Sequence, residues 1–297
     1  GTSALVCLAL STPVMAADIT ITSYSGSVAN GNITITAGDV VTVTGALVLT
    51  GLNGKAIITP SGGGTKVTIS KTGSITTDGQ YGYGIFQDGG NNTTTMSGSI
   101  TTNNTGVNAQ GHGIYNSGNG NTTTVSGSIT TKGGITDGIL DNGNNNATTL
   151  SGTGSIVLTG TDSRGVRNLG STNSTTVAGS IKVTGSNSAG ITNDGSNNEV
   201  YISGTVHNSG TGDTVALENV SGTNNSFTLN EGATIIGGIR TDTGEKNKLN
   251  FDLGLIASYA YSVSGKGVYI SGTGTDEWIF TDLDDDRDAV ATTNGTN

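Results

Sequence analysis

Two histidines, His112 and His207, are the side chains of this chain best suited to proton transfer near neutral pH. Nucleophilic catalysis would place such a histidine beside a serine or cysteine and an orienting carboxylate. The two histidines lie in different sequence motifs, and neither a G-x-S-x-G elbow nor an H-E-x-x-H zinc motif occurs. The only cysteine is Cys7, near the N-terminus. The sequence therefore predicts no catalytic residue, no disulfide and no thiolate metal site.

Gly111-His112-Gly113 is similar to a motif of polygalacturonases, which are right-handed parallel β-helices. Those enzymes also carry an Asn-Thr-Asp motif and an Asp pair before the histidine and an Arg-x-Lys motif after it. None of these stands at a matching place here. We interpret His112 as a loop residue beside a glycine that recurs elsewhere without histidine. A secreted polysaccharide-active β-helix enzyme with an unrecognised site is kept as the alternative function.

Four aspartates alternate near the C-terminus, at Asp282, Asp284, Asp286 and Asp288, as in the start of a calcium-binding loop. In such a loop a glycine makes the sharp turn and a glutamate binds the ion through both oxygens. Arg287 and Thr293 occupy those two places. The segment is better interpreted as a solvated acidic linker, so we expect no metal and no cofactor.

Threonines two residues apart could form a flat Thr-x-Thr face of the kind that ice-binding solenoids present. Thr93/Thr95 and Thr122/Thr124 fit this pattern. The corresponding later pairs drift to other residues, namely Ala147/Thr149, Ser174/Thr176, Glu199/Tyr201, Ser226/Thr228 and Lys248/Asn250. Threonine is also common on any solvated strand face. Ice binding is therefore a lesser alternative.

Composition and charge limit the class of protein. The 297 residues include 50 glycines, only 11% are charged, and the formal net charge is −10. Such a chain is not expected to bind nucleic acid or anionic lipid. An apolar run from Ala4 to Leu10 and a small-residue pattern at Val14-Met15-Ala16 resemble the end of a signal peptide. We expect cleavage after Ala16 or Ala17, with a buried strand as the alternative.

The elements that must position any site follow from three motifs that cycle in fixed order. Each motif contributes one large apolar residue per repeat, in a chain otherwise dominated by Gly, Ser, Thr and Asn. The G-S-I motif supplies Ile75, Ile100, Ile129, Ile156, Ile181, Val206 and Ile235. The G-I-x-N motif supplies Ile85, Ile114, Ile139, Val166, Ile191, Leu217 and Ile239. The N-T-T-T motif supplies Met96, Val125, Leu150, Val177, Ile202, Leu229 and Phe251.

A short strand cannot bury its apolar face alone, so three strands per repeat must wrap into a coil and stack on the next coil. An asparagine precedes each N-T-T-T strand and predicts a stacked amide ladder at one corner, through Asn92, Asn121, Asn146, Asn173, Asn198, Asn225 and Asn247. Glycine before the second strand predicts a sharp corner or a close backbone approach. Seven rungs would form a rod about 34 Å long.

The expected fold is therefore all-β, a right-handed parallel β-helix with three short strands per rung and about seven regular rungs. We expect five segments: a truncated signal peptide (1–16), an N-terminal cap with irregular coils (17–71), the repeat solenoid (72–251), a closing segment (252–281) and an acidic linker (282–297).

These repeats, the signal-like N-terminus and the aromatic residues after Phe251 resemble the passenger domain of a bacterial autotransporter, the type V secretion system. The chain stops at Asn297, without the amphipathic strands of a translocator barrel. The resemblance implies a non-enzymatic protein, secreted or displayed on the outer membrane of a Gram-negative bacterium, with membrane contact only through a missing barrel. It implies adhesion or autoaggregation, with glycans, other cell surfaces or copies of itself as partners. A cleft with convergent carboxylates, or a cation beside an acid, would instead favour the enzyme.

Overall fold

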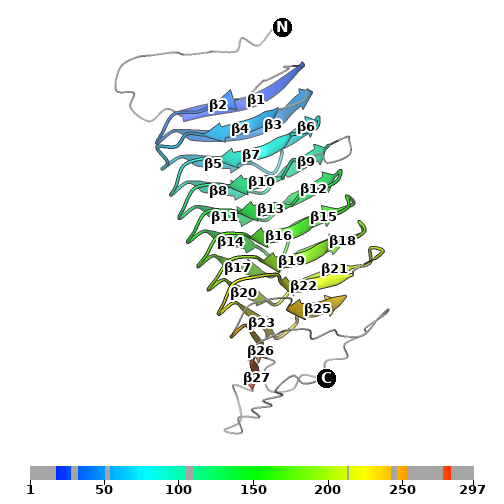
Figure 1. Cartoon of the computed structure of the whole chain (residues 1–297). Coiled ribbons are helices and arrows are strands. Elements are labelled where there is room, and N and C mark those ends of the chain that lie inside the picture. Colours follow the sequence, from blue (N-terminus) through cyan, green and yellow to red (C-terminus); the bar gives the residue numbers. More distant parts are fainter. Residues whose placement is uncertain are drawn as a thin grey trace.

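The protein is a rod of stacked parallel strands (Figure 1), seen in a computed structural model that describes residues 18–27, 33–50, 54–104, 110–212, 214–241, 246–252 and 277–281. The described strands form one 18-stranded and one nine-stranded sheet, and neighbouring strands pair in parallel, as β10 does with β13. The architecture is a parallel β-helix of about eight turns, consistent with right-handed winding. The expected signal peptide, the acidic linker and most of the closing segment lie outside the described residues.

The 18-stranded sheet contains two columns of strands that are joined at the N-terminal end by two longer strands, β1 (Asp18–Ser27) and β3 (Val40–Thr50). We call the first the N-T-T-T column: β5 (Lys66–Ile69), β8 (Thr93–Met96), β11 (Thr122–Val125), β14 (Ala147–Leu150), β17 (Ser174–Val177), β20 (Glu199–Ile202), β23 (Ser226–Asn230), β26 (Lys248–Asp252) and β27 (Glu277–Thr281). The second is the G-S-I column: β6 (Ser74–Asp78), β9 (Ser99–Asn103), β12 (Ser128–Lys132), β15 (Ser155–Leu158), β18 (Ser180–Val183), β21 (Thr205–Asn208) and β24 (Thr234–Ile236).

The nine-stranded sheet is the G-I-x-N column and closes the third side of each coil. Its strands are β2 (Ile33–Thr34), β4 (Lys55–Thr59), β7 (Tyr83–Gln87), β10 (Ile114–Asn116), β13 (Ile139–Asp141), β16 (Arg164–Asn168), β19 (Ala189–Asn193), β22 (Val215–Asn219) and β25 (Gly238–Thr241). Each coil thus contributes one strand to each column, as the three motifs predicted.

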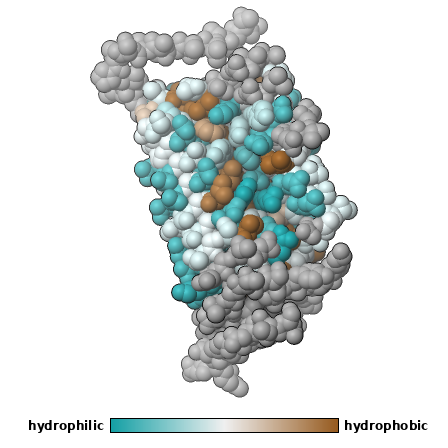
Figure 2. Space-filling model, viewed as in Figure 1, coloured by the Kyte–Doolittle hydropathy of each residue, from teal (hydrophilic) through white to brown (hydrophobic). Residues whose placement is uncertain are grey.

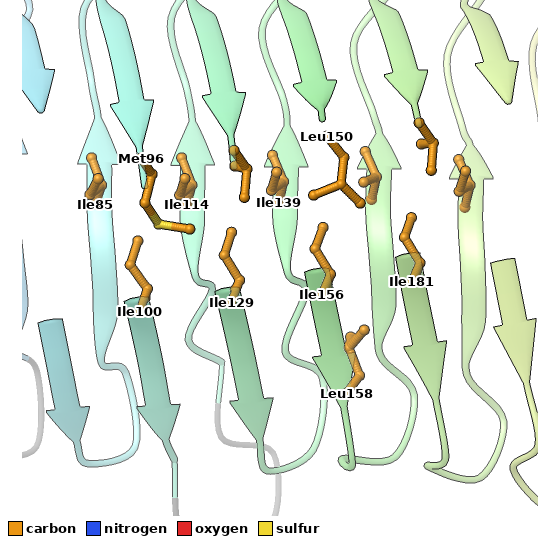
Figure 3. Close-up of a cluster of buried hydrophobic side chains, with 14 of the residues drawn as sticks. Ile85, Met96, Ile100, Ile114, Ile129, Ile139, Leu150, Ile156, Leu158 and Ile181 are labelled. Atoms are coloured by element: carbon orange, nitrogen blue, oxygen red, sulfur yellow. The ribbon is translucent and has the colours of Figure 1, made fainter. Parts of the chain in front are cut away.

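The predicted aliphatic positions stack in register along the rod. Ile100 pairs with Ile129, Ile114 with Ile139, and Val125 with Leu150, and these six side chains have no exposed surface. Figure 3 shows the rows of isoleucines facing one another across the coil interior. Ile239 is partly buried, and Phe251 keeps the register with Leu229. The same columns extend toward the N-terminus through Leu47, Ile57 and Ile69.

In five coils the residue before the inward aliphatic of the G-I-x-N strand is a glycine, and a close approach between coils requires it. A Cβ atom on Gly138 would lie 2.5 Å from the carbonyl oxygen of Gly165 and 2.5 Å from Cγ2 of Ile156. Equivalent contacts face Gly84, Gly113 and Gly165. Both this glycine and the aliphatic residue after it turn toward the interior, so the two residues that flank the pair turn outward.

The predicted asparagine ladder is present, as side-chain to backbone bonds. The Oδ1 of Asn121 accepts the backbone N–H of Asn92, and that of Asn146 accepts the N–H of Asn121, at 2.8 and 2.7 Å. The bonds continue in the same way to Asn247, and all seven side chains are buried. The left-handed backbone lies one residue earlier, at Asn91, Gly120, Asn145, Thr172, Asn197, Asn224 and Lys246.

A second polar column runs inside the rod at the last position of the G-I-x-N motif. It contains Gln87, Asn116, Asp141, Asn168, Asn193 and Asn219, all buried. Asn116 Nδ2 donates to Asp141 Oδ1 at 2.5 Å, and Thr148 Oγ1 donates to Asp141 Oδ2 at 2.8 Å. Burial raises the pKa of Asp141 to about 6, against the opposing effect of these two hydrogen bonds.

Candidate binding face

The outer surface of the nine-stranded sheet carries most of the chemically varied side chains of the rod, and we call it the mixed face. It consists of two outward positions per coil, one before the corner glycine and one after the aliphatic residue. The first position holds Lys55, Tyr83, His112, Asp137, Arg164, Ala189 and Val215. The second holds Ile58, Phe86, Tyr115, Leu140, Arg167, Thr192, Glu218 and Arg240.

Ring side chains gather on β7 and β10. Tyr83 and Tyr115 stack with their centroids 5.8 Å apart and an interplanar angle of 23°, while Phe86 meets Tyr115 edge-on at 5.0 Å. The Lys55 ammonium lies 3.6 Å from the Phe86 centroid, a cation–π geometry. Asn142 Nδ2 donates to the Tyr115 hydroxyl at 2.8 Å, which fixes this ring. We call Tyr83, Phe86, His112 and Tyr115 the aromatic cluster.

His112 belongs to this cluster and is 8% exposed. Its ring lies 5.4 Å from that of Tyr83, and its Nδ1 accepts the backbone N–H of Asp137 at 2.9 Å. An Nδ1 that accepts a hydrogen bond carries no proton, so the imidazole is neutral although an Asp137 carboxylate oxygen is 3.6 Å away. Burial lowers the pKa of His112, which agrees with this assignment. His112 therefore acts as a packed aromatic ring, with Nδ1 occupied.

A polar hollow of about 260 Å³ lies further along the same face. It exists because β19 presents small outward side chains between larger ones on β16, β22 and β25. Ala189 lines the hollow, and both Ala189 and Thr192 are buried. The lining residues are Asp162, Arg164, Asn187, Ser188, Ala189, Val215, Glu218 and Arg240. We call this the polar hollow.

Acids and arginines are interleaved in and beside the hollow. Arg240 forms an ion pair with Glu218, which is 2% exposed and also accepts the Thr192 hydroxyl. Arg167 forms an ion pair with Asp194. Arg164 donates from its Nη1 to the carbonyl oxygen of Asp162 at 2.7 Å. Within the described part of the chain Arg164 makes no ion pair, and its buried Nε has no hydrogen-bond partner.

The outer surfaces of the other two columns are simpler. The predicted Thr-x-Thr pairs stack in register, with Thr93 over Thr122 and Thr95 over Thr124, and Thr94 points inward as expected. Ala147, Glu199 and Lys248 interrupt the same columns. His207 lies on β21 of the 18-stranded sheet, away from the sheet that carries His112. The structure therefore does not place the two histidines in one motif or one sheet.

The described residues contain no group of three or more His, Cys, Asp or Glu side chains arranged to hold a metal ion. They also contain no helix with the length and apolar character needed to cross a membrane. Cys7 and the alternating aspartates from Asp282 to Asp288 fall outside the described ranges.

Sequence reasoning did not find the mixed face, although a signal was present. The repeated residues dominate the sequence pattern, whereas the two outward positions hold a different residue type in each coil. Those two positions, taken alone, place Tyr83, Phe86, Tyr115, Arg164 and Arg167 on one surface. In the view of Figure 2, hydrophobic areas lie among hydrophilic ones and do not merge into one continuous patch.

The fold defines the class of protein, a parallel β-helix repeat protein with one chemically varied face. Comparison with known proteins adds no family to this class: no family model, no curated protein and no solved structure matches the chain.

Proposed function

We propose that the chain is an autotransporter-type passenger that acts outside the cell, secreted or displayed on the outer membrane, as a non-enzymatic adhesin or surface structural protein. The mixed face is the contact surface and a glycan is the ligand. The observation that carries this proposal is the gathering of aromatic rings, arginines and acids on one column of a rod whose other faces are mainly hydroxyl-bearing.

The side chains of the mixed face suit a carbohydrate. Tyr83, Phe86 and Tyr115 are partly exposed and offer apolar surface, and ion pairs such as Arg167–Asp194 present fixed donors and acceptors to hydroxyl groups. The rings are held in place by neighbours, as Tyr115 is by Asn142 and Phe86, so little rotamer freedom remains to be lost on binding. Strands of a rigid scaffold thus present a preorganised surface.

A polysaccharide-active enzyme is the second candidate, because arginines stand beside acids in the polar hollow. A general acid or base needs a carboxyl oxygen within reach of the substrate proton. Both oxygens of Glu218 are taken, one by Arg240 and one by the Thr192 hydroxyl. Asp137 Oδ1 accepts the Arg164 backbone N–H at 2.9 Å. These engagements favour binding over catalysis.

Binding to insoluble polysaccharides and to intact cells tests the proposal. The full chain should bind, and replacing both stacked tyrosines by Tyr83→Ser and Tyr115→Ser should reduce the bound fraction at least about fivefold. Tyr201→Ser is the matched control, since Tyr201 lies on the outer surface of β20 in the other sheet. Equal loss with the control variant would assign adhesion to another surface.

Turnover distinguishes the enzyme from the adhesin in the same samples. We expect no increase in reducing ends and no new soluble fragments after prolonged incubation of the bound polysaccharide. Steady product release that the Arg164→Gln or Glu218→Gln variants abolish would replace the adhesin with the enzyme. Surface exposure is tested separately, by protease treatment of intact cells that produce the natural protein, which should cleave it.

A further inference from the structure

We infer that the mixed face binds a neutral, linear glycan that lies along the rod axis, with one sugar on the aromatic cluster and another in the polar hollow. This inference rests on the proposed function and adds the charge class, the orientation and the minimum length of the ligand. The observation behind the inference is that two separate subsites, the aromatic cluster and the polar hollow, lie on one column of strands.

Charge balance selects a neutral ligand. The cationic side chains of the face are Lys55, Arg164, Arg167 and Arg240, and five carboxylates, those of Asp88, Asp137, Asp162, Asp194 and Glu218, lie on or beside it. The charges on this surface therefore nearly balance, with one more negative than positive group. The whole chain carries a formal net charge of −10, which repels polyanions at long range. Uronate-rich or sulfated chains are disfavoured, both by the charge of this surface and by the net charge of the whole chain.

The hollow contains polar groups that a hydroxyl-rich ligand would satisfy. Asp162 and Asn187 line it and are exposed, while Arg164 and Arg240 line it and are half-buried. Within the described part of the chain Arg164 makes no ion pair. Oxygens that accept and guanidinium and amide groups that donate therefore lie together in a hollow of about 260 Å³, which matches the donor and acceptor character of sugar hydroxyls.

The register sets the spacing between the two subsites. Tyr115 is aligned with Leu140, Leu140 with Arg167, and Arg167 with Thr192. Three strand spacings therefore separate the ring of Tyr115 from the floor of the hollow on β19, about 14 Å along the axis. One strand spacing is close to the length of one sugar unit, so a chain must contain about four units to reach both subsites.

The ligand class and length are tested with the unmodified full chain on defined oligosaccharides. The probes are neutral gluco-, xylo-, manno- and chito-oligosaccharides and acidic oligogalacturonates, each from single sugars to octamers. We expect neutral chains to bind and affinity to rise sharply at about four units. Preference for acidic chains, or full affinity for a single sugar, would overturn the inference while leaving glycan binding in place. Failure of every probe would overturn both the inference and the glycan partner of the proposed function.

Adding one coil between the subsites tests the orientation. A copy of residues 117–141 inserted after Asp141 repeats one 25-residue coil, because Asn116 and Asp141 occupy equivalent places. The aromatic cluster then lies one strand spacing further from the hollow, about 4.8 Å. The minimum length should increase by one sugar unit. An unchanged minimum length would show that the glycan does not run along the axis.

Single substitutions separate the two subsites. Tyr115→Leu and Arg164→Gln should each weaken binding of the longer neutral chains at least about tenfold. Tyr201→Leu and Lys182→Gln are matched controls on the 18-stranded sheet, and each should change affinity by less than about twofold. If only one of the two test variants weakens binding, the two-subsite inference is wrong.

Discussion

Asp141 is the one carboxylate in a column otherwise made of amide side chains. Its neighbours in register are Asn116 and Asn168, and it is fully buried. A buried carboxylate keeps its charge at a cost in stability, whereas an amide at the same place would carry none. The column thus keeps its register through this coil, but at this coil alone it contains an ionisable side chain.

Asp141→Asn should stabilise the fold at neutral pH. The pKa of Asp141 is raised to about 6 in the folded state, so the native protein holds this proton at pH values where the unfolded chain has released it. Stability from this group is therefore present at low pH and is lost as pH rises toward and through the folded pKa. The substitution should raise the free energy of unfolding by about 1 to 3 kcal/mol at pH 7.5.

Urea denaturation at pH 7.5 and at pH 4 measures this effect. The advantage of the variant should shrink at pH 4, where the folded carboxyl is protonated. Asp88→Asn, at an exposed position, is the control and should show a change of less than about 0.5 kcal/mol. A pH-independent difference would mean that the carboxylate charge is not the cause.

Gly138→Ala should destabilise the rod by about 1 to 3 kcal/mol. The new methyl group would meet the Gly165 carbonyl oxygen and Ile156, both at 2.5 Å. Gly152→Ala is the control, because no atom lies within 4 Å of a Cβ placed there. Thermal unfolding followed by circular dichroism compares the two, and similar melting temperatures would contradict the close-approach explanation.

The asparagine ladder links neighbouring coils at one corner through the interior. Asn146→Ala should destabilise the protein by about 1 to 3 kcal/mol, because the Asn121 N–H would remain buried without its acceptor. Asn144→Ala removes a similar bond, to the Ser171 N–H, at an exposed position where water can replace it. That control should cost less than about 0.5 kcal/mol in the same denaturation experiment. Equal costs would show that burial does not decide the strength of the ladder.

Strand columns were predictable because large apolar residues are rare in this chain and recur in fixed order. Met96, Val125 and Leu150 are the only large apolar side chains in their N-T-T-T strands, which leaves one possible register. The position of the left-handed backbone was not predictable from the asparagines. It falls one residue earlier, on Asn or Gly in five coils and on Thr172 and Lys246 in the other two, where the coil geometry overrides residue preference.

The mixed face escaped prediction for a related physical reason. Its members share a location and not a residue type. They lie outside the interior columns, where the stacking of coils places fewer demands on side-chain identity. Tyr115, Leu140 and Arg167 are aligned in space but have no common pattern in sequence. Their alignment emerges only once the interior columns have set the register.

Because each coil contacts only its neighbours, the rod should tolerate loss of one whole coil. Deleting residues 121–145 joins Gly120 to Asn146 and removes β11, β12 and β13 together. The variant should fold, with a smaller urea m-value in proportion to the surface lost. Deleting only residues 121–133 removes two of the three strands and should yield an unfolded or aggregated chain. Comparable folding of both variants would contradict the stacked-coil description.

The direction of the hydrogen bonds between coils has a mechanical consequence. These bonds run along the rod, so tension between its two ends loads the outermost coil first and opens its bonds one after another, as a zipper opens. Each 25-residue coil that peels away would release about 85 Å of chain. A tether built in this way would lengthen stepwise under a shearing flow and dissipate work at every step, while the coils still stacked keep their shape.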